Sequence, residues 1–97
     1  NISSIEIENC IYDLDPVLAC GVVAMKDEKW GEVPCVFIEL KPEKKLSKQQ
    51  IIEHCRSNLA SFKIPKEVVF CSIPKTSTGK IQKFELRKLT PHGVKTS

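Results

Sequence analysis

The residue types best suited to chemistry stand together in one hydroxyl-rich segment, residues 74–80, with the sequence PKTSTGK. Gly79 permits a backbone turn that a side chain would hinder, and Lys80 then supplies a compact cation suited to carboxylate or phosphate oxygens. The segment does not match the phosphate-binding pattern G-x-x-x-x-G-K-[ST], because Pro74 stands at the first glycine and Ile81 replaces the hydroxyl that would meet magnesium. Judged on its own, Lys80 is either an anion-binding lysine or an ordinary surface lysine that follows a turn.

The cysteines give no sign of a metal site. The chain has five of them, Cys10, Cys20, Cys35, Cys55 and Cys71, and no two are spaced as C-x-x-C. Because structural zinc needs closely spaced ligand pairs, we expect no metal here. Their odd number and mostly apolar neighbours predict buried free thiols in a reducing compartment. His54 beside Cys55 is not a base–nucleophile pair, since neighbouring side chains on a helix point about 100° apart.

Charge is distributed unevenly along the chain, whose formal net charge is +3. Residues 1–40 hold two lysines against eight acids, whereas residues 41–97 hold thirteen Lys and Arg against four acids. Such a basic half attracts nucleic acid, phosphates or a nucleotide cofactor; a solvated lysine-rich surface is the alternative. A non-enzymatic nucleic-acid-binding module is therefore one class of function, although we expect Phe37 and Phe70 in the core rather than stacked on bases, which makes nucleic acid an unlikely partner.

Length and composition indicate one folded domain. The chain has 97 residues, of which 41% are hydrophobic and 28% charged, enough apolar side chains for a core. The longest apolar run, residues 17–25, is shorter than the ~20 residues that a membrane span needs, and no basic-then-apolar leader precedes it. The chain has no initiating Met and opens within what resembles a helix cap, so we expect it to be part of a longer protein.

Six elements are expected to position residues 74–80. A capping box of Ser3 and Glu6 begins a first helix, which ends at residues 15–16 after an apolar stripe of Ile7, Ile11 and Leu14. Residues 17–25 and 34–40 predict two strands, antiparallel because their connection is short.

Ser47 with Gln50 begins a second helix, with a stripe of Ile51, Cys55 and Leu59. Residues 67–73 predict a third strand, and residues 81–89 a short closing helix. The fold class is therefore α+β: a small three-stranded sheet with an antiparallel strand pair, packed by about three helices.

Four short motifs in this sequence resemble those of one family. Residues 73–83 (IPKTSTGKIQK) match P-[KR]-T-x-x-G-K-[IV]-x-[RK], and residues 1–8 (NISSIEIE) resemble the end of a second motif whose glycine and hinge would precede residue 1. Residues 30–34 (WGEVP) and 62–65 (FKIP) are similar to W-G-E-x-P and [YF]-K-x-P. In this order the motifs resemble the C-terminal domain of the adenylate-forming superfamily, and W-G-E-x-P is commonest in its acyl-CoA ligases.

The resemblance implies that residues 1–97 form a single mobile C-terminal lid of a larger enzyme. Its N-terminal domain, absent from this chain, would bind ATP, Mg²⁺ and a carboxylic acid. The acid and ATP form an acyl-adenylate and pyrophosphate; a thiol, commonly coenzyme A, then displaces AMP after the lid has rotated. By match to the motif, Lys80 is the catalytic lysine of the first step, and Thr76, Ser77, Thr78 and Gly79 form the phosphate or adenylate loop.

For the thiol step the resemblance indicates the opposite face of the lid. The candidates on the CoA side are Ile2, Ser3, Ser4, Trp30, Gly31 and Arg56. Each has a plainer alternative: helix capping for the serines and for Glu6 and Glu8, a hairpin cap for Trp30, and an exposed helix cation for Arg56. We expect Lys83 and Arg87 to be surface charges.

The resemblance therefore predicts the lid of an ATP-dependent acyl-CoA synthetase, of the kind that serves fatty acid metabolism, inactive without its partner domain. An adenylation domain that loads a carrier protein is the alternative within the superfamily. The expected partners are the N-terminal domain, a small carboxylic acid, ATP and CoA, with no membrane span. From the cysteines we expect an intracellular, reducing compartment, with the cytoplasm and the mitochondrial matrix both left open; the final residues KTS are not an S-K-L type of peroxisomal address.

Overall fold

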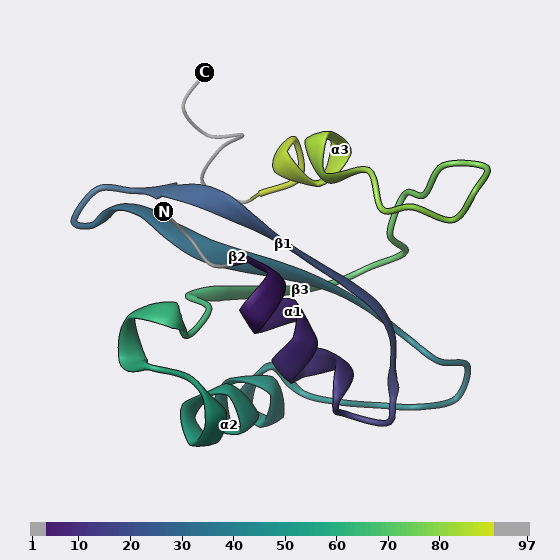
Figure 1. Ribbon diagram of the computed structural model, residues 1–97, viewed down its shortest axis with the longest axis horizontal. Coiled ribbons are helices and arrows are strands. Elements are labelled where there is room, and N and C mark those ends of the chain that lie inside the picture. The colour runs from purple at the N-terminus through teal and green to yellow at the C-terminus, as the bar shows by residue number, and fades with distance from the viewer. Residues whose placement is uncertain (1–3, 91–97) are drawn as a thin grey trace.

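The computed structural model describes residues 4–90. Their elements, in chain order, are α1 (Ser4–Tyr12), β1 (Val17–Asp27), β2 (Gly31–Leu40), α2 (Lys48–Asn58), a short 3₁₀ helix η1 (Ser61–Lys63), β3 (Glu67–Phe70) and α3 (Lys83–Arg87). The strands form one sheet in the order β1-β2-β3, with β1 antiparallel and β3 parallel to β2. Helices α1 and α2 lie on one side of this sheet and α3 on the other (Figure 1). The predicted α+β domain is confirmed.

The sheet is buried on both faces, which explains why its two long strands are nearly continuous apolar runs. One core packs α1 and α2 against the face that carries Cys20, Val22, Val36 and Ile38. The other core packs the α3 side against the opposite face, with Phe37 and Leu86 fully buried. The expectation for Phe37 is confirmed, whereas the one for Phe70 is wrong: it ends the edge strand β3 and is 39% exposed.

Helix α1 runs beside β1, which is an edge strand of the sheet. The Cys20 amide donates to the Tyr12 hydroxyl at 3.1 Å, and the Val22 amide donates to Oε2 of Glu8 at 2.8 Å. These two side chains of α1 therefore satisfy backbone donors that an edge strand would otherwise leave open to another chain.

The local turn and capping signals were mostly correct. The Ser47–Gln50 capping box is confirmed, with the Gln50 amide 3.1 Å from Ser47 Oγ and the Ser47 amide 2.8 Å from Gln50 Oε1. The antiparallel pair is confirmed too, and both strands extend further than predicted because Asp27 Oδ2 accepts the amides of Lys29 and Trp30 and closes a tight turn. The proposed box of Ser3 and Glu6 lies partly outside the described residues.

Three predicted boundaries were wrong. Helix α1 ends at Tyr12, and Leu14 packs against the core from the turn that follows. Strand β3 ends at Phe70, since the Ile73 amide bonds to the Glu39 side chain at 3.1 Å instead of continuing the ladder. Helix α3 begins only at Lys83, because Ile81 is still extended and pairs with Lys75.

The cysteines are buried as predicted, except that Cys71 is partly exposed. Burial raises the pKa of the Cys20, Cys35 and Cys55 thiols to about 12, which keeps them protonated near neutral pH. The His54 ring contacts a backbone group, since its Nε2 lies 2.8 Å from the backbone oxygen of Cys10. No helix within residues 4–90 has both the length and the apolar character to cross a membrane.

Candidate functional site

Residues 74–82, here called the Lys80 hairpin, leave the sheet and return to it as a short two-stranded loop. The Gln82 amide donates to the Pro74 oxygen at 3.0 Å, and the Thr76 amide to the Lys80 oxygen at 2.8 Å. The Gly79 amide closes the tip on the Thr76 oxygen at 2.9 Å. Gly79 has a φ of 89°, the left-handed region that glycine adopts without strain, as a three-residue hairpin loop requires.

The hydroxyls of the hairpin organise its tip. Thr76 Oγ1 accepts the Lys80 amide at 3.1 Å and lies 2.9 Å from Thr78 Oγ1. Thr76 is half-buried, whereas Ser77 and Thr78 are exposed. Of the predicted loop residues, Thr76 therefore fixes the backbone of Lys80, Thr78 supports Thr76 through its hydroxyl, and Ser77 is exposed at the tip.

Ion pairs fix both stems of the hairpin to the rest of the domain. On the incoming stem, Lys75 Nζ lies 2.7 Å from Oε1 of Glu39. The hydrogen bond from Lys75, and then the one from the Ile73 amide, lower the pKa of the Glu39 carboxyl. On the outgoing stem, Lys83 Nζ lies 2.8 Å from Oε2 of Glu8. The prediction that Lys83 is a surface charge is wrong, since it is half-buried in this pair.

Lys80 itself is exposed, and within residues 4–90 no carboxylate forms an ion pair with it. Lys75 and Lys83 are each neutralised by a glutamate, so the free charge of the hairpin lies on the Lys80 ammonium. A cation held this way, on a hydrogen-bonded backbone and without an internal partner, can meet phosphate or carboxylate oxygens of an incoming ligand.

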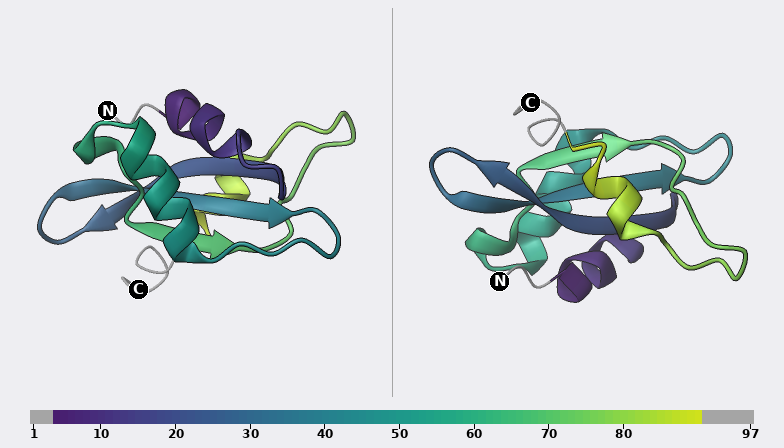
Figure 2. Two further views of the ribbon diagram at one scale, coloured as in Figure 1. Left: turned by 90° about the horizontal axis from the view of Figure 1, so that it is seen from below. Right: turned by 90° about the horizontal axis from the view of Figure 1, so that it is seen from above.

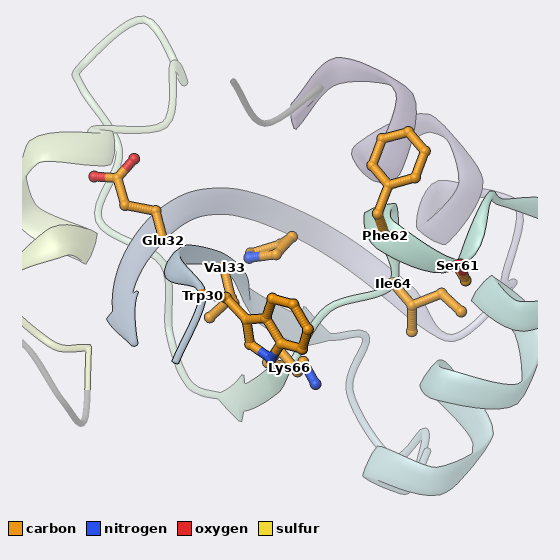
Figure 3. Close-up of a pocket in the computed structure, with 8 residues that line it drawn as sticks. Trp30, Glu32, Val33, Ser61, Phe62, Ile64 and Lys66 are labelled. Carbon is orange, nitrogen blue, oxygen red and sulfur yellow. The ribbon is translucent and has the colours of Figure 1, made fainter. Parts of the chain in front are cut away.

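A pocket of about 480 Å³ lies elsewhere, at the turn between β1 and β2. Its lining residues come from two segments and are Trp30, Glu32, Val33 and Pro34 on one side and Ser61, Phe62, Ile64 and Lys66 on the other (Figure 3). We call it the Trp30 pocket. Trp30 is 62% and Phe62 76% exposed, so the lining offers two exposed aromatic side chains together with two charged ones, Lys66 and Glu32. Gly31, with a φ of 82°, makes the turn that begins β2.

The Trp30 pocket was only partly foreseen. The motifs WGEVP and FKIP each contribute residues to it, yet Phe62 and Lys66 were not among the predicted site residues. A signal for them existed in the sequence, because WGEVP stands at the start of the second expected strand and FKIP stands just before the third. If those two strands pair side by side, both motifs come together. Arg56, by contrast, does not line the pocket; it lies on α2 and pairs with Glu53 at 3.0 Å.

Of the remaining CoA-side candidates, the structure describes only Ser4. Ser4 begins α1, and its Oγ accepts a hydrogen bond from Lys83 at 3.3 Å. Ile2 and Ser3 lie outside the described residues. Among residues 4–90, no group of three or more His, Cys, Asp or Glu side chains is arranged to hold a metal ion.

The two candidate sites lie at opposite ends of the domain. In Figure 1 the β1–β2 turn forms the left end of the molecule, and the Lys80 hairpin, drawn in yellow-green, extends at the right end. Both views in Figure 2 keep them apart along the same axis. The Lys80 hairpin and the Trp30 pocket are therefore two separate sites.

Known proteins share both the sequence and the fold. A family model described as the AMP-binding enzyme C-terminal domain matches residues 6–80. A 2-methylpropanoate–CoA ligase of Humulus lupulus is 49% identical over 92 residues, which cover 92% of this chain and 16% of that protein. The chain thus spans about a sixth of the length of this curated relative.

Solved structures agree. A Mycobacterium tuberculosis fatty acyl CoA synthetase superposes with a TM-score of 0.84 at 39% identity, over 92% of this chain and 18% of that one. An anthranilate CoA ligase in complex with anthranoyl-AMP gives a TM-score of 0.82 at 37% identity, over 91% of this chain and 18% of the other. Because the family model covers most of the chain and these folds coincide, the chain belongs to the AMP-binding enzyme C-terminal domain family.

Proposed function

We propose that this chain is the mobile C-terminal lid of an AMP-forming acyl-CoA synthetase, and that Lys80 serves its first step. One observation carries the assignment of Lys80: its ammonium is exposed and unpaired among the described residues, at the tip of a hairpin whose flanking lysines, Lys75 and Lys83, are both neutralised. The family to which the chain belongs supports the class of enzyme.

The first step brings two anions together. A carboxylate oxygen attacks the α-phosphorus of ATP, the bond to the β-phosphate oxygen breaks, and pyrophosphate leaves with the bonding electrons. A fixed ammonium between the carboxylate and the phosphate oxygens offsets their repulsion and orients the attack. The chain offers no cluster of metal ligands within residues 4–90, so we place the binding of ATP, Mg²⁺ and the small acid in the N-terminal domain, which is this lid's partner.

The second step needs a site for the thiol, and we assign the Trp30 pocket to coenzyme A. Trp30 and Phe62 provide aromatic faces for an adenine ring, and Lys66 provides a cation for the neighbouring phosphates. In this step the thiolate attacks the acyl carbon and AMP leaves. Gly31 shapes the turn that presents Trp30, whereas Arg56 contributes only if α2 also faces the cofactor.

Other acceptors and another class of function make different predictions. A carrier-protein-loading enzyme would release little free CoA thioester and would transfer the acyl group to a carrier domain instead. A nucleic-acid-binding module would use exposed aromatics on the sheet, and Phe70 is exposed there, but Phe37 is fully buried.

The buried or partly buried state of the cysteines is compatible with a reducing compartment such as the cytoplasm or the mitochondrial matrix.

The assignment of Lys80 is tested in the intact enzyme by carboxylate-dependent pyrophosphate exchange. Lys80→Ala should lower exchange by about 100- to 1,000-fold, the usual effect of removing one group that stabilises transition-state charge. Thioester formation from pre-made acyl-adenylate and CoA should persist. Lys45→Ala is the matched control, since Lys45 is also exposed but lies in the loop before α2. Normal exchange in Lys80→Ala would refute the assignment.

The assignment of the Trp30 pocket is tested with the same two half-reactions. Trp30→Ala should raise the KM for CoA about 5- to 150-fold, the equivalent of losing one stacked base, and leave pyrophosphate exchange unchanged. Phe84→Ala, which removes an exposed aromatic on α3, serves as control. An unchanged KM for CoA, or an equal loss in both half-reactions, would show that CoA does not bind in this pocket.

A further inference from the structure

The Glu8 carboxylate connects three elements beside the Lys80 hairpin. Its Oε2 atom accepts the Val22 amide of β1 at 2.8 Å and lies 2.8 Å from Nζ of Lys83, the first residue of α3. The Glu8 side chain is only 16% exposed, which strengthens a charge pair relative to the surface. Lys83 also donates to Ser4 Oγ, at 3.3 Å. Glu8 therefore does more than add a solubilising charge to α1.

Lys83 is close enough to Lys80 along the chain to affect the position of the Lys80 backbone. Three residues of extended backbone span at most about 10 Å, and this stretch is packed along its length. Ile81 pairs with Lys75 across the hairpin, and the Gln82 amide bonds to the Pro74 oxygen. A displacement of Lys83 therefore also displaces the backbone of Lys80.

Glu8 fixes Lys83, at the base of the outgoing stem, relative to the sheet. Because the same carboxylate oxygen accepts a backbone amide of the edge strand β1, it is held relative to the sheet as well as to α1. The incoming stem has its own tie, since Lys75 pairs with Glu39 of β2. On the outgoing side, Ile81 packs against the sheet core, and the Glu8–Lys83 pair supplies the equivalent charged attachment.

We propose that Glu8 and Lys83 are positioning residues for adenylate formation, which hold the outgoing stem of the Lys80 hairpin against α1 and β1 so that the Lys80 ammonium is presented at a fixed place. This inference rests on the proposed role of Lys80. Neither side chain is required to touch substrate. Their contribution lies in orientation, and a misplacement of about 1 Å can cost up to about 100-fold in rate.

The pair is tested by Lys83→Met in the intact enzyme, a change that removes the charge and keeps a long apolar stem. We expect kcat for pyrophosphate exchange to fall at least about 10-fold while the KM for ATP stays within about twofold. Thioester formation from pre-made acyl-adenylate should stay within about twofold, because it does not use Lys80. Lys83→Arg should restore most of the exchange, since it keeps the charge.

Two further variants keep the test decisive. Glu8→Gln preserves an acceptor for the Val22 amide and removes the charge, so it should reproduce the loss of exchange even if Lys83→Met folds poorly. Lys88→Met is the matched control: Lys88 is also on this segment and pairs with Glu85 at 3.7 Å, but its side chain is 68% exposed.

Either of two results would overturn the positioning role. One is unchanged exchange in both Lys83→Met and Glu8→Gln; the other is an equal fall in both half-reactions, which indicates general destabilisation of the domain. If instead Lys80→Ala itself leaves exchange intact, the proposed function fails first, so the two failures are distinguishable.

Discussion

Gly21 is the position at which a single methyl group should disturb both the core and the Lys80 hairpin. It lies in β1 on the face that packs against α3. A Cβ atom at this position would stand 2.8 Å from Cδ1 of Leu86 and 3.3 Å from Cγ2 of Ile81. Leu86 is fully buried, so its side chain has little room to rotate away, and Ile81 belongs to the hairpin. Gly21→Ala therefore pushes α3 and the hairpin away from the sheet.

The size of the effect follows from two opposing terms. Overpacking of a well-filled core costs about 1–3 kcal/mol. Replacing a strand glycine by alanine returns about 0.5–1 kcal/mol through reduced backbone entropy of the unfolded chain. The difference between the two terms is about 0–2.5 kcal/mol. Because Leu86 is fully buried and cannot easily give way, we expect the free energy of unfolding to fall by about 1–2 kcal/mol, and a 1 kcal/mol loss lowers the Tm of a domain this size by about 4–8 °C.

Urea and thermal unfolding of the 97-residue chain measure this effect, and a double-mutant cycle identifies its cause. If the clash with Leu86 is responsible, Leu86→Val should relieve part of it, and the double variant should be more stable than the sum of the single effects predicts. A neutral or stabilising Gly21→Ala, or strict additivity with Leu86→Val, would refute the reasoning. Gly31→Ala is a useful contrast, because no atom lies within 4 Å of the added Cβ and only its φ of 82° opposes the change.

Three further predictions concern local interactions. The pKa of Glu39 is lowered from 4.5 by hydrogen bonds from Lys75 and the Ile73 amide; the resulting stabilisation is present above 4.5 and lost as pH falls through the lowered value, so in urea titrations the excess stability of wild type over Glu39→Gln should be largest at about pH 6 and shrink progressively as the pH is taken below 4.5. Ser47→Ala should lower the free energy of unfolding by about 1 kcal/mol with an unchanged m-value, because it removes the capping box. A thiol reagent at neutral pH should label the partly exposed Cys71 first; equally fast labelling of Cys35, whose pKa burial raises to about 12, would contradict the packing described.

Local signals in the sequence predicted local structure well. The Ser47–Gln50 box works because both partners lie within one helical turn, and the short polar connection after β1 permitted only an antiparallel return. These features depend on residues that are close in sequence. The apolar runs also predicted the two long strands, since a sheet covered on both faces needs apolar residues at every position.

The errors arose where distant residues decide the outcome. Strand β3 stops early because the Ile73 amide finds Glu39, which is 34 residues away. Lys83 is half-buried because Glu8 and Ser4 of α1 receive it, and Ser4 is 79 residues away. Phe70 has the neighbours of a core residue, but it ends an edge strand. The pattern of apolar and polar residues along the chain does not predict these contacts, because they depend on how α1 and β2 pack around the hairpin.

The same packing of distant segments sets the separation between the two candidate sites. The Trp30 pocket lies at the start of β2, which begins at Gly31, and the Lys80 hairpin is anchored at Glu39 near the end of that strand. Eight residues of strand span about 26 Å, and the continuous β1–β2 ladder makes this separation rigid. If Lys80 serves adenylate formation and the pocket binds the adenine end of CoA, the rigid sheet keeps the two sites apart, and a rotation of the whole domain between the steps is the movement that would present each site in turn.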